Sequence, residues 1–159
     1  MKYDIRLDQC SGEPLAVVRR IATPDELPRV IPDACGLVWG VVRSRQIPGA
    51  GRHVAVYLDD RLTLEIGVEL DAPFGGHGEV IDSATPSGPV AATIHRGPYG
   101  GLREAHQAIR AWCQDNGHRM AGPRWEVYGH WEEAWNDDPS KITVDVFYLL
   151  NEAESTDSA

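Results

Sequence analysis

The sequence of 159 residues runs twice through the same course of strand, helix, strand and strand. Three pairs of segments correspond between the halves, namely residues 14–18 and 89–93, residues 53–57 and 124–128, and residues 62–66 and 142–146. In this alignment Tyr57 and Tyr128 occupy equivalent positions. Because a duplicated unit normally packs about a pseudo-twofold axis, the repeat predicts an α+β fold of two βαββ units with a ligand cleft where they meet.

Residues 124–131 are dense in aromatic and β-branched side chains, which favours a strand. The two-residue period of a strand places Glu126, Tyr128 and His130 on one face and Trp125 on the other. If the Glu126 face lines a cavity, a carboxylate beside aromatic rings suits a cationic, planar or protonatable molecule, with a cation–π attraction of roughly 0.5 to 2 kcal/mol per ring. If that face is open to water, Glu126 is an ordinary surface carboxylate.

Other aromatic side chains are candidates for the same pocket. The repeat places only Ala55 opposite Glu126, so we expect one carboxylate in the cleft together with the two equivalent tyrosines. Trp39 lies off the apolar stripe of the first helix, Tyr99 precedes the second helix, and Phe147 shares its strand face with a carboxylate. Each of these three rings could instead serve only in packing. The candidate ligand-binding residues are Glu126, Tyr57, Tyr128, Trp39, Phe147 and Tyr99.

A helical pattern follows the leading strands of each half. Residues 23–26 form a helix-start signature. Because proline lacks a backbone donor, Pro28 and Pro32 predict a short helical turn followed by a longer helix that begins at Pro32. The second helix is expected to start near Leu102 and to end near Gly117.

The charge balance limits the class of partner. The chain carries 15 Lys and Arg against 24 Asp and Glu, a net charge of −9, which disfavours a nucleic-acid surface. No apolar run approaches the roughly 20 residues of a membrane helix, and the N-terminus lacks a signal-sequence pattern. We therefore expect a cytoplasmic protein with no nucleic-acid or membrane partner.

The residue types that usually carry metal or covalent chemistry are scattered. Cys10, Cys35 and Cys113 lack metal-ligand spacing and are expected to be buried, reduced thiols. The six histidines show no ligand spacing either, and the sequence has no nucleophile motif and no phosphate-binding glycine loop. We expect neither a metal site nor a cofactor.

A family resemblance rests on one ordered set of residues. The set consists of His95, Gly97, Pro98 and Tyr99, then Leu102 and Trp112 within a helix, Gly117, residues 125–128 and a final apolar strand. In this order and spacing the chain, from about residue 5 to residue 150, resembles the GyrI-like small-molecule-binding domain. That domain is also the effector-binding domain of many AraC-type and MerR-type multidrug-responsive regulators.

The resemblance implies a curved antiparallel sheet backed by two helices around a central pocket at the pseudo-twofold axis. In that pocket a strand glutamate, matching Glu126, meets lipophilic and often cationic ligands among aromatic rings. We expect one domain over residues 1–150, with halves of about 1–70 and 79–150, and a flexible tail over 151–159. The chain departs from multidomain relatives in having no helix-turn-helix segment, so their regulator role does not carry over, and it is richer in tryptophan.

Three functions remain open on the sequence alone. The first is a single-domain protein that binds lipophilic aromatic or cationic compounds, with a role in drug or toxin sequestration. The second follows from the resemblance, because some stand-alone family members are hydrolases that open the cyclopropane ring of cyclopropanoid genotoxins; Glu126 would then act as general acid or base, assisted by Tyr128. The third is an acidic module that inhibits a protein partner and needs no pocket.

Overall fold

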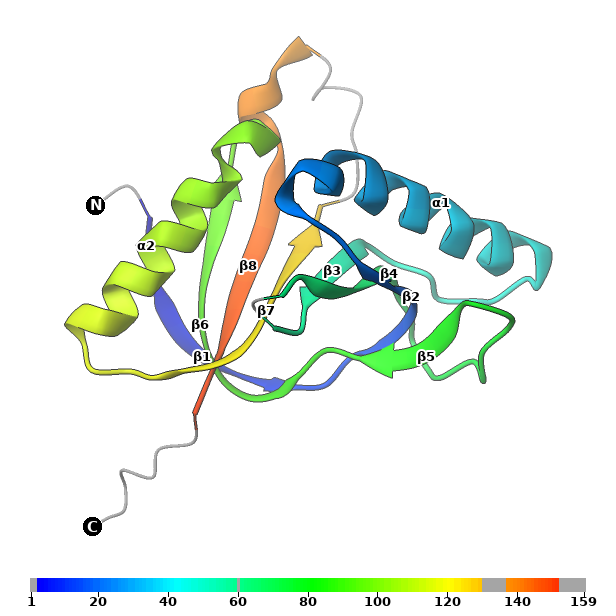
Figure 1. Cartoon of the computed structure of the whole chain (residues 1–159), viewed down its shortest axis with the longest axis horizontal. Helices are drawn as coiled ribbons and strands as arrows, with labels where there is room; N and C mark the ends of the chain where they lie inside the picture. The colour runs from blue at the N-terminus through cyan, green and yellow to red at the C-terminus, as the bar shows by residue number, and fades with distance from the viewer. Residues whose placement is uncertain (1–2, 60, 130–136, 152–159) are drawn as a thin grey trace.

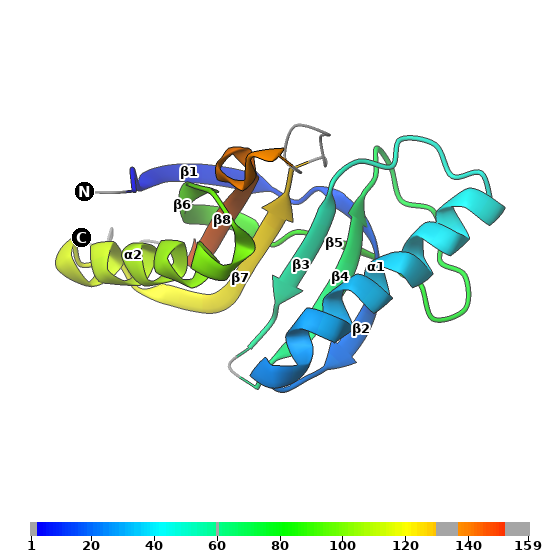
Figure 2. The same ribbon diagram turned by 90° about the horizontal axis from the view of Figure 1, so that it is seen from above.

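The computed structural model describes residues 3–59, 61–129 and 137–151. Within these residues the chain forms one antiparallel sheet of eight strands with two α-helices on one side of it (Figures 1 and 2). The first half contains β1 (Arg6–Ser11), β2 (Pro14–Ile21), α1 (Leu27–Ser44), β3 (His53–Tyr57) and β4 (Thr63–Glu69). The second contains β5 (Ile81–Ala84), β6 (Ser87–Arg96), α2 (Leu102–Asp115), β7 (Met120–Tyr128) and β8 (Thr143–Leu150). Three 3₁₀ turns are η1 (Pro24–Glu26), η2 (Tyr99–Gly101) and η3 (Pro139–Lys141).

The strand order is symmetric about the β3–β7 pair and confirms the duplicated α+β fold. The order is β1-β6-β8-β7-β3-β4-β2-β5. In the β3–β7 register Ala55 lies opposite Glu126, while Tyr57 lies opposite Arg124 and Tyr128 lies opposite His53. The pseudo-twofold axis therefore passes between Ala55 and Glu126, and the two tyrosines hold equivalent places at the ends of their strands.

The leading strand of each half is paired with the other half. β1 pairs with β6 of the second half, and β5 pairs with β2 of the first, so β1 and β5 are the edge strands of the sheet. The two halves are thus linked by three strand pairings, at β3–β7 in the middle and at both outer edges.

The helices obey the same symmetry. The buried residues Ala34, Val38 and Val42 of α1 are matched on α2 by Ala105, Ile109 and Cys113. The two sets differ by the same offset in residue number that relates Tyr57 to Tyr128. Each helix packs its stripe on the sheet strands of its own half.

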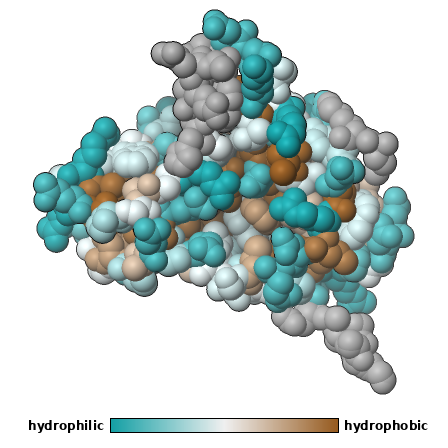
Figure 3. Space-filling view, turned by 180° about the vertical axis from the view of Figure 1, so that it is seen from behind, coloured by the Kyte–Doolittle hydropathy of each residue, from teal (hydrophilic) through white to brown (hydrophobic). Residues whose placement is uncertain are grey.

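The opposite face of the sheet has its own core. Leu15, Val54, Val90 and Trp125 are fully or almost fully buried there, although no helix in the described part of the chain packs on this face. The curl of the sheet encloses these side chains. Seen from behind, the outer surface carries apolar groups separated by hydrophilic ones (Figure 3).

The prediction of a break at Pro32 is wrong, because α1 begins at Leu27 and contains Pro32 in its interior. A proline at this place removes the helical hydrogen bond to the carbonyl of Pro28. Both prolines are exposed, so water can hydrate that carbonyl and the helix continues. The expected hairpin of the third and fourth strands is confirmed by the β3–β4 pairing.

No helix in the described part of the chain is long and apolar enough to cross a membrane.

Candidate functional site

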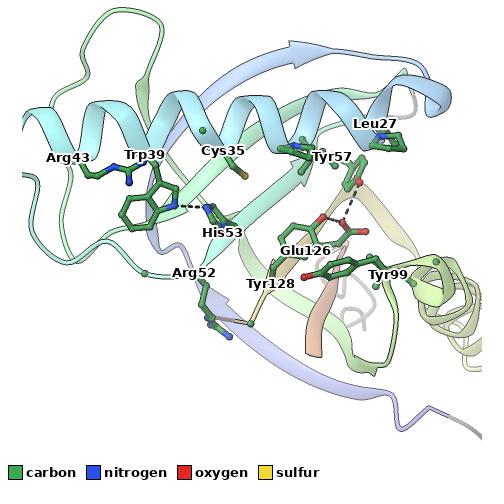
Figure 4. A pocket seen from close by; sticks show the side chains of 18 residues that line it. Leu27, Cys35, Trp39, Arg43, Arg52, His53, Tyr57, Tyr99, Glu126 and Tyr128 are labelled. Atoms are coloured by element: carbon green, nitrogen blue, oxygen red, sulfur yellow. Dashed lines mark hydrogen bonds between the residues drawn. The ribbon is translucent and has the colours of Figure 1, made fainter. Parts of the chain in front are cut away.

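A cavity of about 1090 Å³ lies between α1 and the start of α2, above β3 and β7 (Figure 4). Leu27, Ile31 and Trp39 of α1 form one wall, and Tyr99 closes the side towards α2. Glu126 of β7 contributes a carboxylate to the lining. Because Glu126 lies at the pseudo-twofold axis, this carboxylate has no counterpart from the other half.

Glu126 is only 4% exposed and is held by donors from three elements. Its Oε1 accepts hydrogen bonds from the hydroxyl of Tyr128 and, at 3.4 Å, from the hydroxyl of Tyr57. Its Oε2 lies 2.6 Å from Nε2 of His106 on α2. A buried carboxylate needs such donors, since each replaces part of the hydration that burial removes.

The chain of contacts continues from His106 towards the outer side of α2. His106 Nδ1 lies 2.7 Å from the hydroxyl of Tyr148, and Arg110 donates to the same hydroxyl at 2.8 Å. One assignment satisfies every group: Arg110 donates to Tyr148, Tyr148 donates to Nδ1, and the Nε2–H of His106 donates to Glu126. All donors then point towards the Glu126 carboxylate.

The phenols around this carboxylate stay protonated over the ordinary pH range. Burial raises the pKa of Tyr57 and Tyr128 well above the usual value, and the negative charge of Glu126 raises both pKa values further. Burial also raises the pKa of Tyr148 to about 12, although Arg110 lowers it in part. These hydroxyls therefore remain hydrogen-bond donors.

The pseudosymmetry explains why the space lies on the α1 side. Cys35 of α1 stands where α2 has His106, and Ala55 of β3 stands where β7 has Glu126. Two further pairs are Val68 with Tyr148 and Trp39 with Arg110. The second half fills its space with the polar chain, while smaller side chains at Cys35 and Ala55 leave the first half open. Burial raises the pKa of the Cys35 thiol to about 11, so Cys35 adds no charge to the cavity.

The end of the cavity remote from Tyr57 has different chemistry (Figure 4). The indole N–H of Trp39 donates to Nε2 of His53 at 2.5 Å. Arg43 lies with its guanidinium carbon 6.0 Å from the centroid of the Trp39 ring. Arg52 lines the same end.

Of the six predicted ligand-binding residues, five line the cavity: Glu126, Tyr57, Tyr128, Trp39 and Tyr99. Tyr99 and Tyr128 also contact each other edge to face, with ring centroids 6.0 Å apart. Phe147 is not in the lining. It pairs with Trp125 and stacks on that ring at 5.1 Å on the opposite face of the sheet. His130, predicted on the Glu126 face, lies outside the described residues.

Sequence reasoning missed His106 and Tyr148. The spacing of the histidines along the sequence bears only on metal binding and gives no sign of a contact with Glu126. No cluster of three or more His, Cys, Asp or Glu side chains in the described ranges is arranged to hold a metal. His106 adjoins the buried stripe of α2 at the place that Cys35 holds on α1, so a helix-to-helix alignment places it beside the sheet but does not give its partner.

A scan against protein-family models found no match, and a search of curated proteins found no similar sequence. Solved structures do match. The C-terminal domain of EcmrR has a TM-score of 0.75 at 21% identity, over 95% of this chain and 99% of that domain. The structure of SAV2435 bound to tetraphenylphosphonium has a TM-score of 0.65 at 10% identity, over 99% and 98% of the two chains. A hydrolase from Listeria innocua has a TM-score of 0.60 at 10% identity, over 93% and 92%. These proteins share the fold of this chain.

Proposed function

We propose that this chain is a small-molecule-binding protein for lipophilic aromatic or cationic compounds, and that Glu126 anchors them. The observation that carries the proposal is a buried carboxylate in the lining of a large cavity whose other walls are mainly apolar and aromatic. A cation entering this space would meet a charge that bulk water does not screen. Sequestration of a drug or toxin is the role that such binding would serve.

The arrangement of donors favours binding of a cation over a structural role for Glu126. The carboxylate accepts hydrogen bonds from Tyr57, Tyr128 and His106, none of which is an arginine or lysine. None of these three donors carries a permanent positive charge. An aromatic cation would supply that charge and stack against Tyr99 and Tyr128.

The comparisons support the same class of ligand. The shared fold includes a protein bound to tetraphenylphosphonium, a bulky lipophilic cation. The resemblance to GyrI-like domains also implies lipophilic, often cationic ligands. An acidic protein-interaction module would need no cavity, so the 1090 Å³ space favours the small-molecule proposal.

The test measures binding of tetraphenylphosphonium and of neutral triphenylphosphine oxide by calorimetry. Glu126→Gln keeps the shape and removes the charge, so we expect binding of the cation to weaken by roughly 1 to 3 kcal/mol and binding of the neutral compound to change little. Glu13→Gln makes the same charge change at an exposed site outside the cavity lining and serves as the control. Equal binding of the cation to both variants would refute the anchor role.

A second candidate function is hydrolysis, and the 2.6 Å contact between Glu126 and His106 favours it. Glu126 would act as general acid or base on water, or on the carbonyl conjugated to a strained cyclopropane ring, while Tyr128 and the other rings clamp a planar substrate. Glu126→Gln should then still bind a neutral cyclopropanoid compound but lose about 100-fold or more in turnover. Mass spectrometry of the products separates this function from binding alone.

A further inference from the structure

The cavity is elongated and has two chemically different ends. Its lining follows α1 from Leu27 to Arg43, which at about 1.5 Å per residue corresponds to roughly 24 Å along the helix. Glu126 lies at one end with Tyr57, and Arg43 lies at the other with Trp39 (Figure 4). A compact cation bound at Glu126 would leave the second end unused.

Two arginines line the second end, and one of them is already engaged. Arg52 donates from Nε to Glu69 at 3.1 Å and from NH1 to Asp145 at 3.2 Å. Two carboxylates thus offset its single charge. Arg52 fixes the wall of the cavity but offers little attraction to a ligand.

Arg43 is placed differently. Among the described residues no ion pair joins Arg43 to a carboxylate. It is also not needed to cap α1, because the carbonyls of Val41, Val42 and Arg43 accept hydrogen bonds from the backbone N–H groups of residues 45–47. Arg43 is exposed, so its guanidinium donors are open to solvent and to a group bound in the cavity.

Trp39 presets the position of this guanidinium. The hydrogen bond from its indole N–H to His53 fixes the plane of the ring, and Arg43 lies over that ring. The planar fork of a guanidinium matches the two oxygens of a carboxylate. The contact with the ring favours this placement of the exposed Arg43 side chain.

We propose that Arg43 and Trp39 form a second subsite of the cavity, which binds an anionic group of the ligand. The subsite rests on the proposed function, and it narrows the ligand class to extended aromatic molecules with two ends. One end carries a cation or hydrogen-bond donor for Glu126, and the other carries a carboxylate or similar oxyanion for Arg43.

The test uses two rod-shaped dyes that differ at one end only and are long enough to extend along the cavity: 4-[4-(4-carboxystyryl)styryl]-1-methylpyridinium and its methyl ester. We expect Arg43→Met to weaken binding of the carboxylate dye by about tenfold and to change binding of the ester by less than about twofold. Arg45→Met removes the same charge two residues further on, outside the cavity lining, and should leave both affinities unchanged. Glu126→Gln should weaken both dyes alike, because both carry the pyridinium.

The outcomes separate the subsite from the function on which it rests. Equal weakening of both dyes by Arg43→Met would mean that Arg43 only packs on Trp39, and no weakening of either would mean that it does not reach the ligand; both results overturn the subsite. Binding of the ester that depends on Glu126 but not on Arg43 would keep the proposed function while refuting the subsite. Failure of the unaltered protein to bind either dye would count against the proposed function and the subsite together.

Discussion

At the residue scale, Glu126 shows how one position on a symmetry axis acquires a special environment. Its strand partner Ala55 is the equivalent residue of the other half, so the fold provides this place only once. Tyr57 and Tyr128 approach it from the two halves, and His106 approaches from α2 alone. The symmetric backbone therefore carries an asymmetric set of donors.

The two tyrosines should contribute unequally to stability. The Tyr128 hydroxyl makes the closer contact with Oε1, while Tyr57 lies at 3.4 Å and also contacts Arg124 through its ring. We expect Tyr128→Phe to lower the free energy of unfolding by about 1 to 2 kcal/mol, since a donor to a buried charge is lost. Tyr57→Phe keeps the cation–π contact and should cost less than about 1 kcal/mol. Urea unfolding at pH 7 checks both values, and equal losses would contradict this ranking.

The raised phenol pKa values also predict an alkaline limit to stability. Burial raises the pKa of Tyr57 and Tyr128, and that of Tyr148 to about 12, above the value of about 10 in an unfolded chain. Folding therefore favours the protonated phenols, and their contribution is complete below pH 10 and is lost as the pH rises towards the folded values. We expect the free energy of unfolding to fall steadily above about pH 10.

Tyrosinate absorbance provides the matching measurement. The three buried phenols should ionise together with unfolding in an alkaline titration, and replacing Tyr57 by Phe should reduce the pH dependence of stability. Ionisation of all the tyrosines near pH 10 in a protein that is still folded would contradict the expectation.

At the element scale, the repeat alignment predicted more than the individual patterns did. It relates β3 to β7 correctly, and the observed registers of both β-hairpins agree with it. The β7–β8 register accounts for the position of Phe147. This residue lies opposite Trp125, whose side chain points away from Glu126. The two-residue period of a strand divides its residues between two faces. It does not show which of these faces lies on the same side of the sheet as a given face of the neighbouring strand.

The helices show what local sequence patterns do not predict. The two prolines of α1 predict a helix that begins only at Pro32. Burial of Ala34, Val38 and Val42 stabilises a helix that continues through Pro32. The role of His106 was equally hidden, since a histidine beside a helical stripe has no meaning until the facing strand is known. In both cases tertiary packing determined the structure, and the local sequence pattern did not.

Two glycines provide a test of how closely the elements pack. A methyl group on Gly67 of β4 would lie 1.8 Å from the carbonyl oxygen of Ala16 on β2, whereas one on Gly40 of α1 would meet no atom within 4 Å. We expect Gly67→Ala to destabilise the protein by about 3 kcal/mol or more, because the backbone of β2 must move. Gly40→Ala should stabilise it by about 0.5 to 1 kcal/mol through helix propensity. Thermal unfolding of both variants decides, and a neutral Gly67→Ala would contradict the close approach.

At the scale of the whole molecule, the exchange of β1 and β5 makes the halves interdependent. In sequence, β1 belongs to the first half and β5 to the second. In the sheet, β1 pairs with β6 of the second half and β5 pairs with β2 of the first. The cavity depends on the same arrangement, since α1 and Tyr57 belong to the first half while Glu126 and Tyr99 belong to the second. Of the predicted tail over residues 151–159, residues 152–159 lie outside the described ranges.

Division of the chain between the halves tests this interdependence. Fragments of residues 1–74 and 75–159 would each expose the strand edge that β3 or β7 covers, and each would lose the partner of its own leading strand. We expect each fragment alone to give the circular dichroism of a largely unfolded chain, because the buried side chains of either half are too few to offset its conformational entropy. Mixed in equal amounts, the fragments should regain the sheet and bind tetraphenylphosphonium. Independent folding of either fragment would show that the β3–β7 and outer-edge pairings are dispensable, and failure of the folded mixture to bind the cation would place the ligand outside the interface of the two halves.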